Sequence, residues 1–87
     1  MLAVMTPYDG DEATVGNGVM VALATDQRQT VDAVHARALE MGGANEGDPG
    51  VRSSAELYPE AGVPELAMYI AYFRDVDGNK LAISCPA

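Results

Sequence analysis

The chain has 87 residues, 48% of them hydrophobic, and 13 acidic against 5 basic residues, which gives a formal net charge of −8. This length excludes a second domain and allows only a small core. The few Lys and Arg residues are scattered among acidic neighbours, which argues against binding to nucleic acid or to a membrane surface. No apolar run approaches the about 20 residues of a membrane span. The single Cys85 cannot form an internal disulfide, so we expect a cytoplasmic protein.

The N-terminal residues predict an isolated strand followed by a connector. Leu2 to Met5 is short and apolar, and the turn-rich sequence TPYDGD follows it at residues 6–11. We expect a strand at a sheet edge, because no hairpin partner comes next. Residues 1–17 are therefore predicted to be an N-terminal strand and connector, and residues 18–87 the main module.

A buried strand and an amphipathic helix are predicted to open the main module. Residues 19–24 are apolar throughout, which is typical of a strand buried on both faces. Asp26 is expected to cap the following helix, with Gln29 as its capping-box partner, and Gly42-Gly43 to end it. The apolar residues at helical spacing are Val31, Val34, Ala38 and Leu39.

Three further strands are predicted in the second half of the chain. Residues 44–52 contain two glycines and a proline, which favours an irregular edge strand. Residues 66–74 and 80–85 are rich in strand formers, and the turn DVDGN at 75–79 should join them as an antiparallel hairpin. A short helical turn is expected around residues 55–58.

Two motifs point to a known family. The helix reads VDAVHARALEMGG over residues 31–43, and the hairpin reads YFRDVDGNKL over residues 72–81. Both resemble the vicinal oxygen chelate superfamily, which includes glyoxalases, bleomycin-resistance proteins and extradiol dioxygenases and usually has Pro at the place of Val76. The resemblance extends from Gly16 to Cys85 and is to the C-terminal half of a small glyoxalase-like protein.

This resemblance implies an α+β fold. We expect a single βαβββ module plus an N-terminal edge strand, with a mixed sheet and one main helix on its convex face. Family members generally carry two such modules that enclose a cavity, whereas this chain carries one. A lone module leaves a sheet edge and an apolar concave face in water. We therefore expect a homodimer, with exchange of the N-terminal strand between the two chains as an open option.

The resemblance also bears on metal binding. In metal-dependent members, a His or Gln on the first strand and a Glu on the last strand coordinate a divalent ion. The alignment places Met20 and Ala82 at these two positions. A thioether suits Cu(I), and alanine has no donor atom. We therefore expect no metal and no other cofactor, and metal-dependent lyase or dioxygenase activity is disfavoured.

Three other features with chemical potential are predicted to be structural. His35 lies beside the apolar helix stripe, which favours a packed histidine bonded to a nearby carbonyl. Cys85 has no second histidine or paired carboxylate near it, which favours an inert hydrophobe. The acidic turn at residues 75–79 lacks the spacing of a calcium loop, whose twelfth position would fall on Pro86.

The candidate ligand-binding residues are those expected on the concave face and at its polar rim. Because side chains alternate along a strand, residues 20, 22 and 24 share one face of the first strand. Tyr69 and Tyr72 fall on opposite faces of their strand, so only one of them can lie on the concave face. The full set is Met20, Ala22, Arg52, Tyr58, Tyr72, Ala82 and Ser84. Such a lining of small apolar groups suits an apolar or aromatic ligand.

Three functions remain open on the sequence. The first is a glyoxalase-like small-molecule binding or interaction module that lacks the family metal site and acts as a homodimer. The second is a metal-independent enzyme of the same superfamily that uses polar groups such as Arg52 and Tyr72. The third is an inactive truncated half-module.

Overall fold

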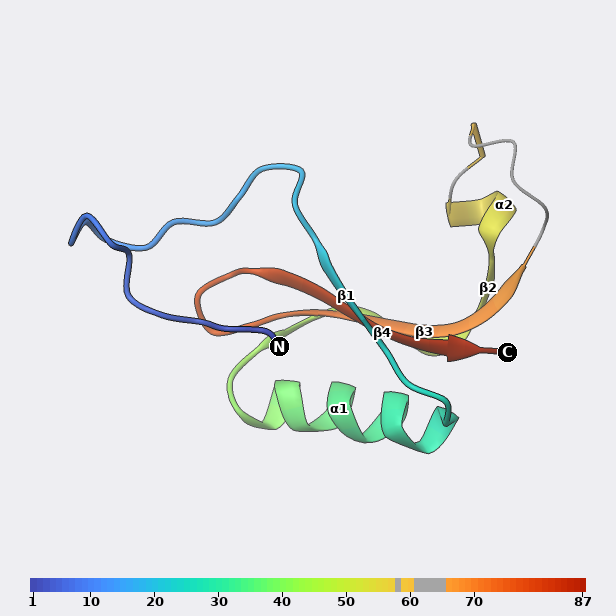
Figure 1. The fold of residues 1–87 in the computed structure, drawn as a ribbon. Coiled ribbons are helices and arrows are strands. Elements are labelled where there is room, and N and C mark those ends of the chain that lie inside the picture. Colours follow the sequence, from blue (N-terminus) through green and yellow to red (C-terminus); the bar gives the residue numbers. More distant parts are fainter. Residues whose placement is uncertain (58, 61–65) are drawn as a thin grey trace.

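The computed structural model shows a four-stranded mixed sheet with one long helix on one of its faces (Figure 1). The structure describes residues 1–57, 59, 60 and 66–87. The elements are β1 (Val21–Ala24), α1 (Arg28–Glu40), β2 (Ala44–Ser53), α2 (Ser54–Leu57), β3 (Ala67–Arg74) and β4 (Lys80–Pro86). The predicted α+β fold with βαβββ order is confirmed. Within the described residues, no helix has the length and apolar character needed to cross a bilayer.

The sheet has the order β1-β4-β3-β2, so the first two strands in the chain form its two edges. Strand β1 is parallel to β4, with Ala22 opposite Ala82, and the other two pairs are antiparallel. The register of β2 against β3 shifts on both sides of Gly47. The prediction of an irregular edge strand rich in glycine and proline is therefore confirmed.

Helix α1 starts one residue later than predicted. Gln27 is the N-cap residue, with extended backbone angles, and it makes no side-chain capping bond. Its carbonyl oxygen accepts hydrogen bonds from the N–H groups of Thr30 and Val31. The predicted capping box of Asp26 and Gln29 is therefore wrong, because it was placed one residue too early along the chain. The predicted stop is confirmed, since Gly42 has a φ of +101°.

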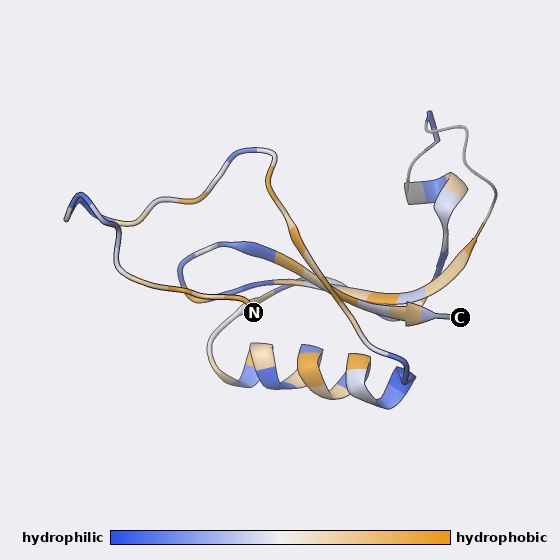
Figure 2. Cartoon of the chain, viewed as in Figure 1, coloured by the Kyte–Doolittle hydropathy of each residue, from blue (hydrophilic) through white to orange (hydrophobic). Residues whose placement is uncertain are grey.

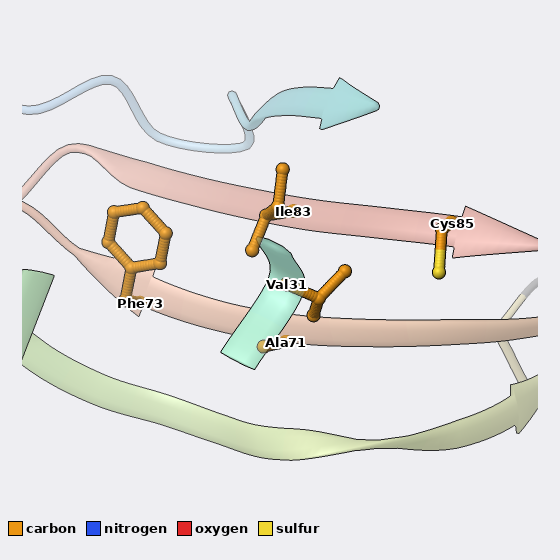
Figure 3. Close-up of a cluster of buried hydrophobic side chains, with 5 residues drawn as sticks. All are labelled: Val31, Ala71, Phe73, Ile83 and Cys85. Carbon is orange, nitrogen blue, oxygen red and sulfur yellow. The ribbon is translucent and has the colours of Figure 1, made fainter. Parts of the chain in front are cut away.

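The core lies between α1 and one face of the sheet (Figure 3). Its buried residues are Val31, Ala71, Phe73, Ile83 and Cys85. The partly buried residues that pack around them are Leu23, Val34, Ala38, Tyr69 and Leu81. Figure 2 shows the apolar positions of the helix on the side toward the sheet. Cys85 is a free, buried thiol, so its predicted role as a packed small hydrophobe is confirmed.

The N-terminal segment, residues 1–20, is irregular. The predicted strand at Leu2 to Met5 is wrong, since this segment contains turns but no strand. Gly10 donates a hydrogen bond to the carbonyl of Pro7, and no backbone hydrogen bond between described residues joins the segment to the sheet. A strand needs a neighbour for its N–H and C=O groups, and the single chain provides none here. Figure 1 shows the segment as a long excursion beside the β3–β4 hairpin.

The β3–β4 hairpin is closed by the carboxylate of Asp75. It accepts hydrogen bonds from the backbone N–H groups of Asp77 and Asn79 at 3.0 and 2.9 Å, and from the side-chain amide of Asn79 at 2.9 Å. Burial raises the pKa of Asp75, but these bonds and the N–H of Gly78 outweigh it and hold the pKa below its usual 3.8. The predicted role of residues 75–79 as a turn is confirmed.

We expect Val31→Ala to lower the free energy of unfolding by about 2 kcal/mol, because Val31 is fully buried and its two lost methyl groups leave a cavity. Urea unfolding followed by circular dichroism measures the change at a fixed protein concentration. The matched control is Val76→Ala, since Val76 is 70% exposed in the hairpin turn. Equal effects of the two substitutions would contradict the assigned core.

The lowered pKa of Asp75 predicts a pH dependence of stability. The folded state holds this carboxylate in its ionised form, so its contribution is complete above pH 3.8 and is lost as the pH falls through the lower folded-state pKa. Asp75→Asn keeps a side-chain carbonyl for the turn but cannot ionise. The stability difference between the wild type and this variant should therefore be largest near neutral pH and shrink in acid. The control is Asp77→Asn in the same turn, which should cost less stability at neutral pH than Asp75→Asn, because no described residue donates a hydrogen bond to the Asp77 carboxylate.

Candidate functional site

The face of the sheet opposite α1, which we call the open face, carries the alternate side chains of β1, β3 and β4. Core residues Ala71, Phe73 and Ile83 point toward the helix, so their neighbours in each strand point away from it. Two rows result from the strand register. The first row crosses β1, β4 and β3 at Ala22, Ala82 and Tyr72. The second row crosses the same strands at Ala24, Ser84 and Ile70.

These rows bring together four of the predicted ligand-binding residues: Ala22, Tyr72, Ala82 and Ser84. Ala82, Ser84 and Ile70 are buried, whereas Ala22 is exposed and Tyr72 is half-buried. The floor of the open face therefore consists mainly of small side chains. Met20 precedes β1 and is 36% exposed, so it lies outside these rows. Tyr58 lies outside the described residues.

Arg52, also predicted, reaches the open face from the edge strand β2. Its guanidinium donates hydrogen bonds to the carbonyl oxygens of Ile70 at 2.5 Å and Asp48 at 2.9 Å. Its central carbon lies 5.4 Å from the ring centroid of Tyr72. Gly47 makes room for this arrangement, since a Cβ there would lie 3.0 Å from the Tyr72 ring and 3.3 Å from the Arg52 guanidinium. The bulged edge strand thus fixes a cation over an aromatic ring.

Two further cations of the open face were missed by the sequence analysis. The ammonium group of Lys80 lies 5.6 Å from the centroid of the Tyr72 ring. Arg74 forms an ion pair with Glu46 at 2.7 Å and donates to the carbonyl of Gly78. The hydrogen bond from Arg74 lowers the pKa of Glu46, with burial acting in the opposite sense. The alternation that selected Tyr72 and Ala82 also places Arg74 and Lys80 on this face.

Tyr69 and Tyr72 lie on opposite faces of β3, as predicted. The hydroxyl group of Tyr69 donates to the Asp32 carboxylate at 2.5 Å, on the helix side of the sheet. This hydrogen bond is the main reason that the pKa of Tyr69 is raised. The guanidinium carbon of Arg28 lies 4.8 Å from its ring centroid. Tyr69 is therefore part of the contact between the helix and the sheet, and Tyr72 is the aromatic residue of the open face.

His35 is a packed helix residue, which confirms the structural interpretation. It is buried and its Nε2 lies 3.0 Å from the side-chain oxygen of Asn45. Its ring meets Phe73 edge-on, with the centroids 6.5 Å apart. The predicted carbonyl partner is thus a side-chain amide, and no sequence pattern identified Asn45 in advance. His35 lies on the core side of the sheet and does not contribute to the open face.

The residues at the two family metal positions do not fit a divalent ion. Met20 offers a thioether and Ala82 a methyl group, so neither supplies the nitrogen or oxygen donor that such a site needs. In the described ranges, no three or more His, Cys, Asp or Glu side chains gather closely enough to hold a metal. We derive no metal-dependent step for this protein.

A hollow of about 960 Å³ lies between the N-terminal segment and the β3–β4 hairpin, and Lys80 of the open face borders it. Apolar residues such as Leu2, Met5 and Val19 line it, together with several carboxylates including Asp9 and Asp75. None of the six predicted ligand-binding residues that the structure describes borders it. It is a gap under an irregular segment, and no backbone hydrogen bond among the described residues ties that segment to the sheet.

Two solved structures resemble this chain. A glyoxalase/bleomycin resistance protein from Albidiferax ferrireducens has a TM-score of 0.72 and 35% identity, over 91% of this chain and 57% of that protein. A hypothetical protein from S. aureus has a TM-score of 0.60 and 27% identity, over 80% of this chain and 50% of that protein. Comparisons with protein-family models and with curated proteins give no match.

The chain therefore has the vicinal oxygen chelate-like fold of glyoxalase and bleomycin-resistance proteins, as the two motifs predicted. It spans just over half the length of the first of these structures and half of the second. It is a glyoxalase-like module.

Proposed function

We propose that this chain is a glyoxalase-like binding module whose open face holds a small apolar or aromatic molecule, and that a second copy of the chain closes the site. The observation that carries the proposal is the open face itself. It combines a floor of small side chains, Ala82 and Ser84, with one aromatic ring, Tyr72, and two cations at the ring. Helix α1 covers only the other face of the sheet. Such a concave, mainly apolar surface with a few polar groups is typical of ligand sites.

The exposed N-terminal segment supports self-association. Its large apolar side chains are unusually open to solvent, including Val4 at 69%, Met5 at 78% and Tyr8 at 107% relative exposure. Figure 2 shows hydrophobic residues along much of this segment. The sheet also has two edges, β1 and β2, each paired on one side only. Apolar surface and free strand edges of this kind favour pairing with another chain.

The donor chemistry favours binding over metal-dependent catalysis. Met20 and Ala82 supply no hard ligand, and Arg52 donates hydrogen bonds to two backbone carbonyl oxygens. A general acid or base would need a titratable group with an oriented partner, and we assign none here. The proposal includes a cytoplasmic location, because the only cysteine is a free, buried thiol.

The first test is the oligomeric state. Size-exclusion chromatography with light scattering should give twice the chain mass of 9.1 kDa at micromolar concentration. The double variant Val4→Asp/Met5→Asp should raise the dimer dissociation constant at least tenfold, because it puts charge on the apolar segment. Met41→Asp is the control, since Met41 is also exposed but lies at the C-terminal end of α1. A stable monomer would overturn the dimer.

The second test locates the ligand with benzamide as a neutral aromatic probe. In 1H–15N spectra it should shift the amide signals of Ala82 and Ser84 and leave those of the exposed helix residues unchanged. Ala22→Trp fills the open face and should weaken this response at least tenfold. Ala36→Trp, on the exposed side of α1, is the control and should preserve it. Shifts spread evenly over the chain would argue against a site on the open face.

A further inference from the structure

We propose that the ligand of the open face is an anion, namely a carboxylate joined to an aromatic or apolar group, and that Lys80 and Arg52 hold its charge beside Tyr72. This inference rests on the proposed function for the position of the ligand and adds its chemical class. It starts from the charges of the chain, which has 13 acidic and only 5 basic residues. In such a chain every cation has an abundance of carboxylates to pair with, so a cation left without one needs an explanation.

Three of the five cations have evident structural roles. Arg37 forms an ion pair with Glu40, and Arg74 forms one with Glu46. Arg28 lies over the ring of Tyr69 on the helix side. Arg52 and Lys80, like Arg28, form no ion pair with any described residue, but they differ from it in lying together against a single ring, that of Tyr72. The open face therefore carries local positive charge on a strongly acidic chain.

Two carboxylates of β2 are engaged by other groups, and Asp75 and Asp77, which line the same hollow as Lys80, form no ion pair with it. Asp48 offers Arg52 its backbone carbonyl, while its carboxylate accepts a hydrogen bond from the side-chain amide of Asn45 at 2.7 Å. Glu46 is taken up by Arg74, although the charge of Lys80 also contributes to lowering its pKa. No described carboxylate therefore forms an ion pair with either cation at Tyr72.

Their geometry is suited to an anion. Two carbonyl oxygens fix the Arg52 guanidinium, which has five N–H donors and so keeps some for a ligand. Lys80 is half-buried, and its ammonium group has three donors and no hydrogen bond to a described residue. Two like charges near one ring repel each other, and an anion bound beside the ring would offset this repulsion. Partial burial strengthens the attraction relative to bulk water.

The rest of the open face fits the uncharged part of such a ligand. The half-buried Tyr72 ring and the exposed Ala22 in the same row offer apolar surface, above a floor of buried Ala82, Ser84 and Ile70. An inorganic anion would leave this floor unused, whereas a neutral aromatic molecule would leave the two cations without a partner. An aromatic carboxylate uses both halves of the surface.

The experiment compares benzoate with benzamide, which has the same ring and nearly the same shape but no charge. Titrations of the full chain, followed by the amide signals of Ala82 and Ser84, should give a dissociation constant at least tenfold lower for benzoate. This preference should shrink as sodium chloride is raised. Lys80→Met keeps an apolar stem and should abolish the preference. Arg28→Met is the control, because it removes the same charge from a cation over a tyrosine on the opposite face.

Any of four other results would overturn the inference, and each would identify which part of it is wrong. Equal affinities for the two probes would reject the anionic class and leave the proposed binding face intact. No binding of either probe would reject both proposals. A benzoate preference that survives Lys80→Met would reject this site for the charge. Loss of the dimer in Lys80→Met, measured by light scattering, would show that a carboxylate of the second copy is the partner of Lys80.

Discussion

The contact between α1 and the β3–β4 pair determines the rest of the module. Val31 fits against Ala71, Phe73, Ile83 and Cys85, which takes every second side chain of two central strands into the core (Figure 3). The remaining side chains of these strands must lie on the open face. A shift of one residue in either strand would exchange Phe73 for Tyr72 or Ile83 for Ala82, so the packing that stabilises the fold also fixes the residues of the site.

Much of this arrangement could be predicted from local sequence, because its determinants are local. The helical stripe, the glycine stop at Gly42 and the turn around Asp75 each depend on residues close together in the chain. Alternation along β3 then predicted that Tyr69 and Tyr72 lie on opposite faces, and Tyr72, the one included in the candidate set, lies on the open face. The same rule could have found Lys80. It could not have placed Arg52, because the register of β2 shifts twice before that residue and its side chain reaches back to carbonyls on two strands.

The N-terminal segment shows where prediction from local sequence fails. Leu2 to Met5 has the composition of a strand, yet it forms none in the single chain, because a strand is completed by hydrogen bonds to a neighbour that the local sequence does not contain. Ordering this segment costs conformational entropy, and only a partner surface that buries its apolar side chains can offset that cost. The wrong prediction and the proposed self-association therefore have one physical origin.

Binding and self-association are then thermodynamically linked. If the facing wall of the site comes from a second copy, the cations at Tyr72 lie in a more enclosed space in the dimer than in the monomer. Enclosure lowers the local dielectric, which increases both the repulsion between Arg52 and Lys80 and their attraction to an anion. Closing an empty site is therefore opposed by the two charges, and closing a filled one is favoured. Since linkage is reciprocal, the factor by which an anion strengthens the dimer must equal the factor by which dimerisation strengthens anion binding.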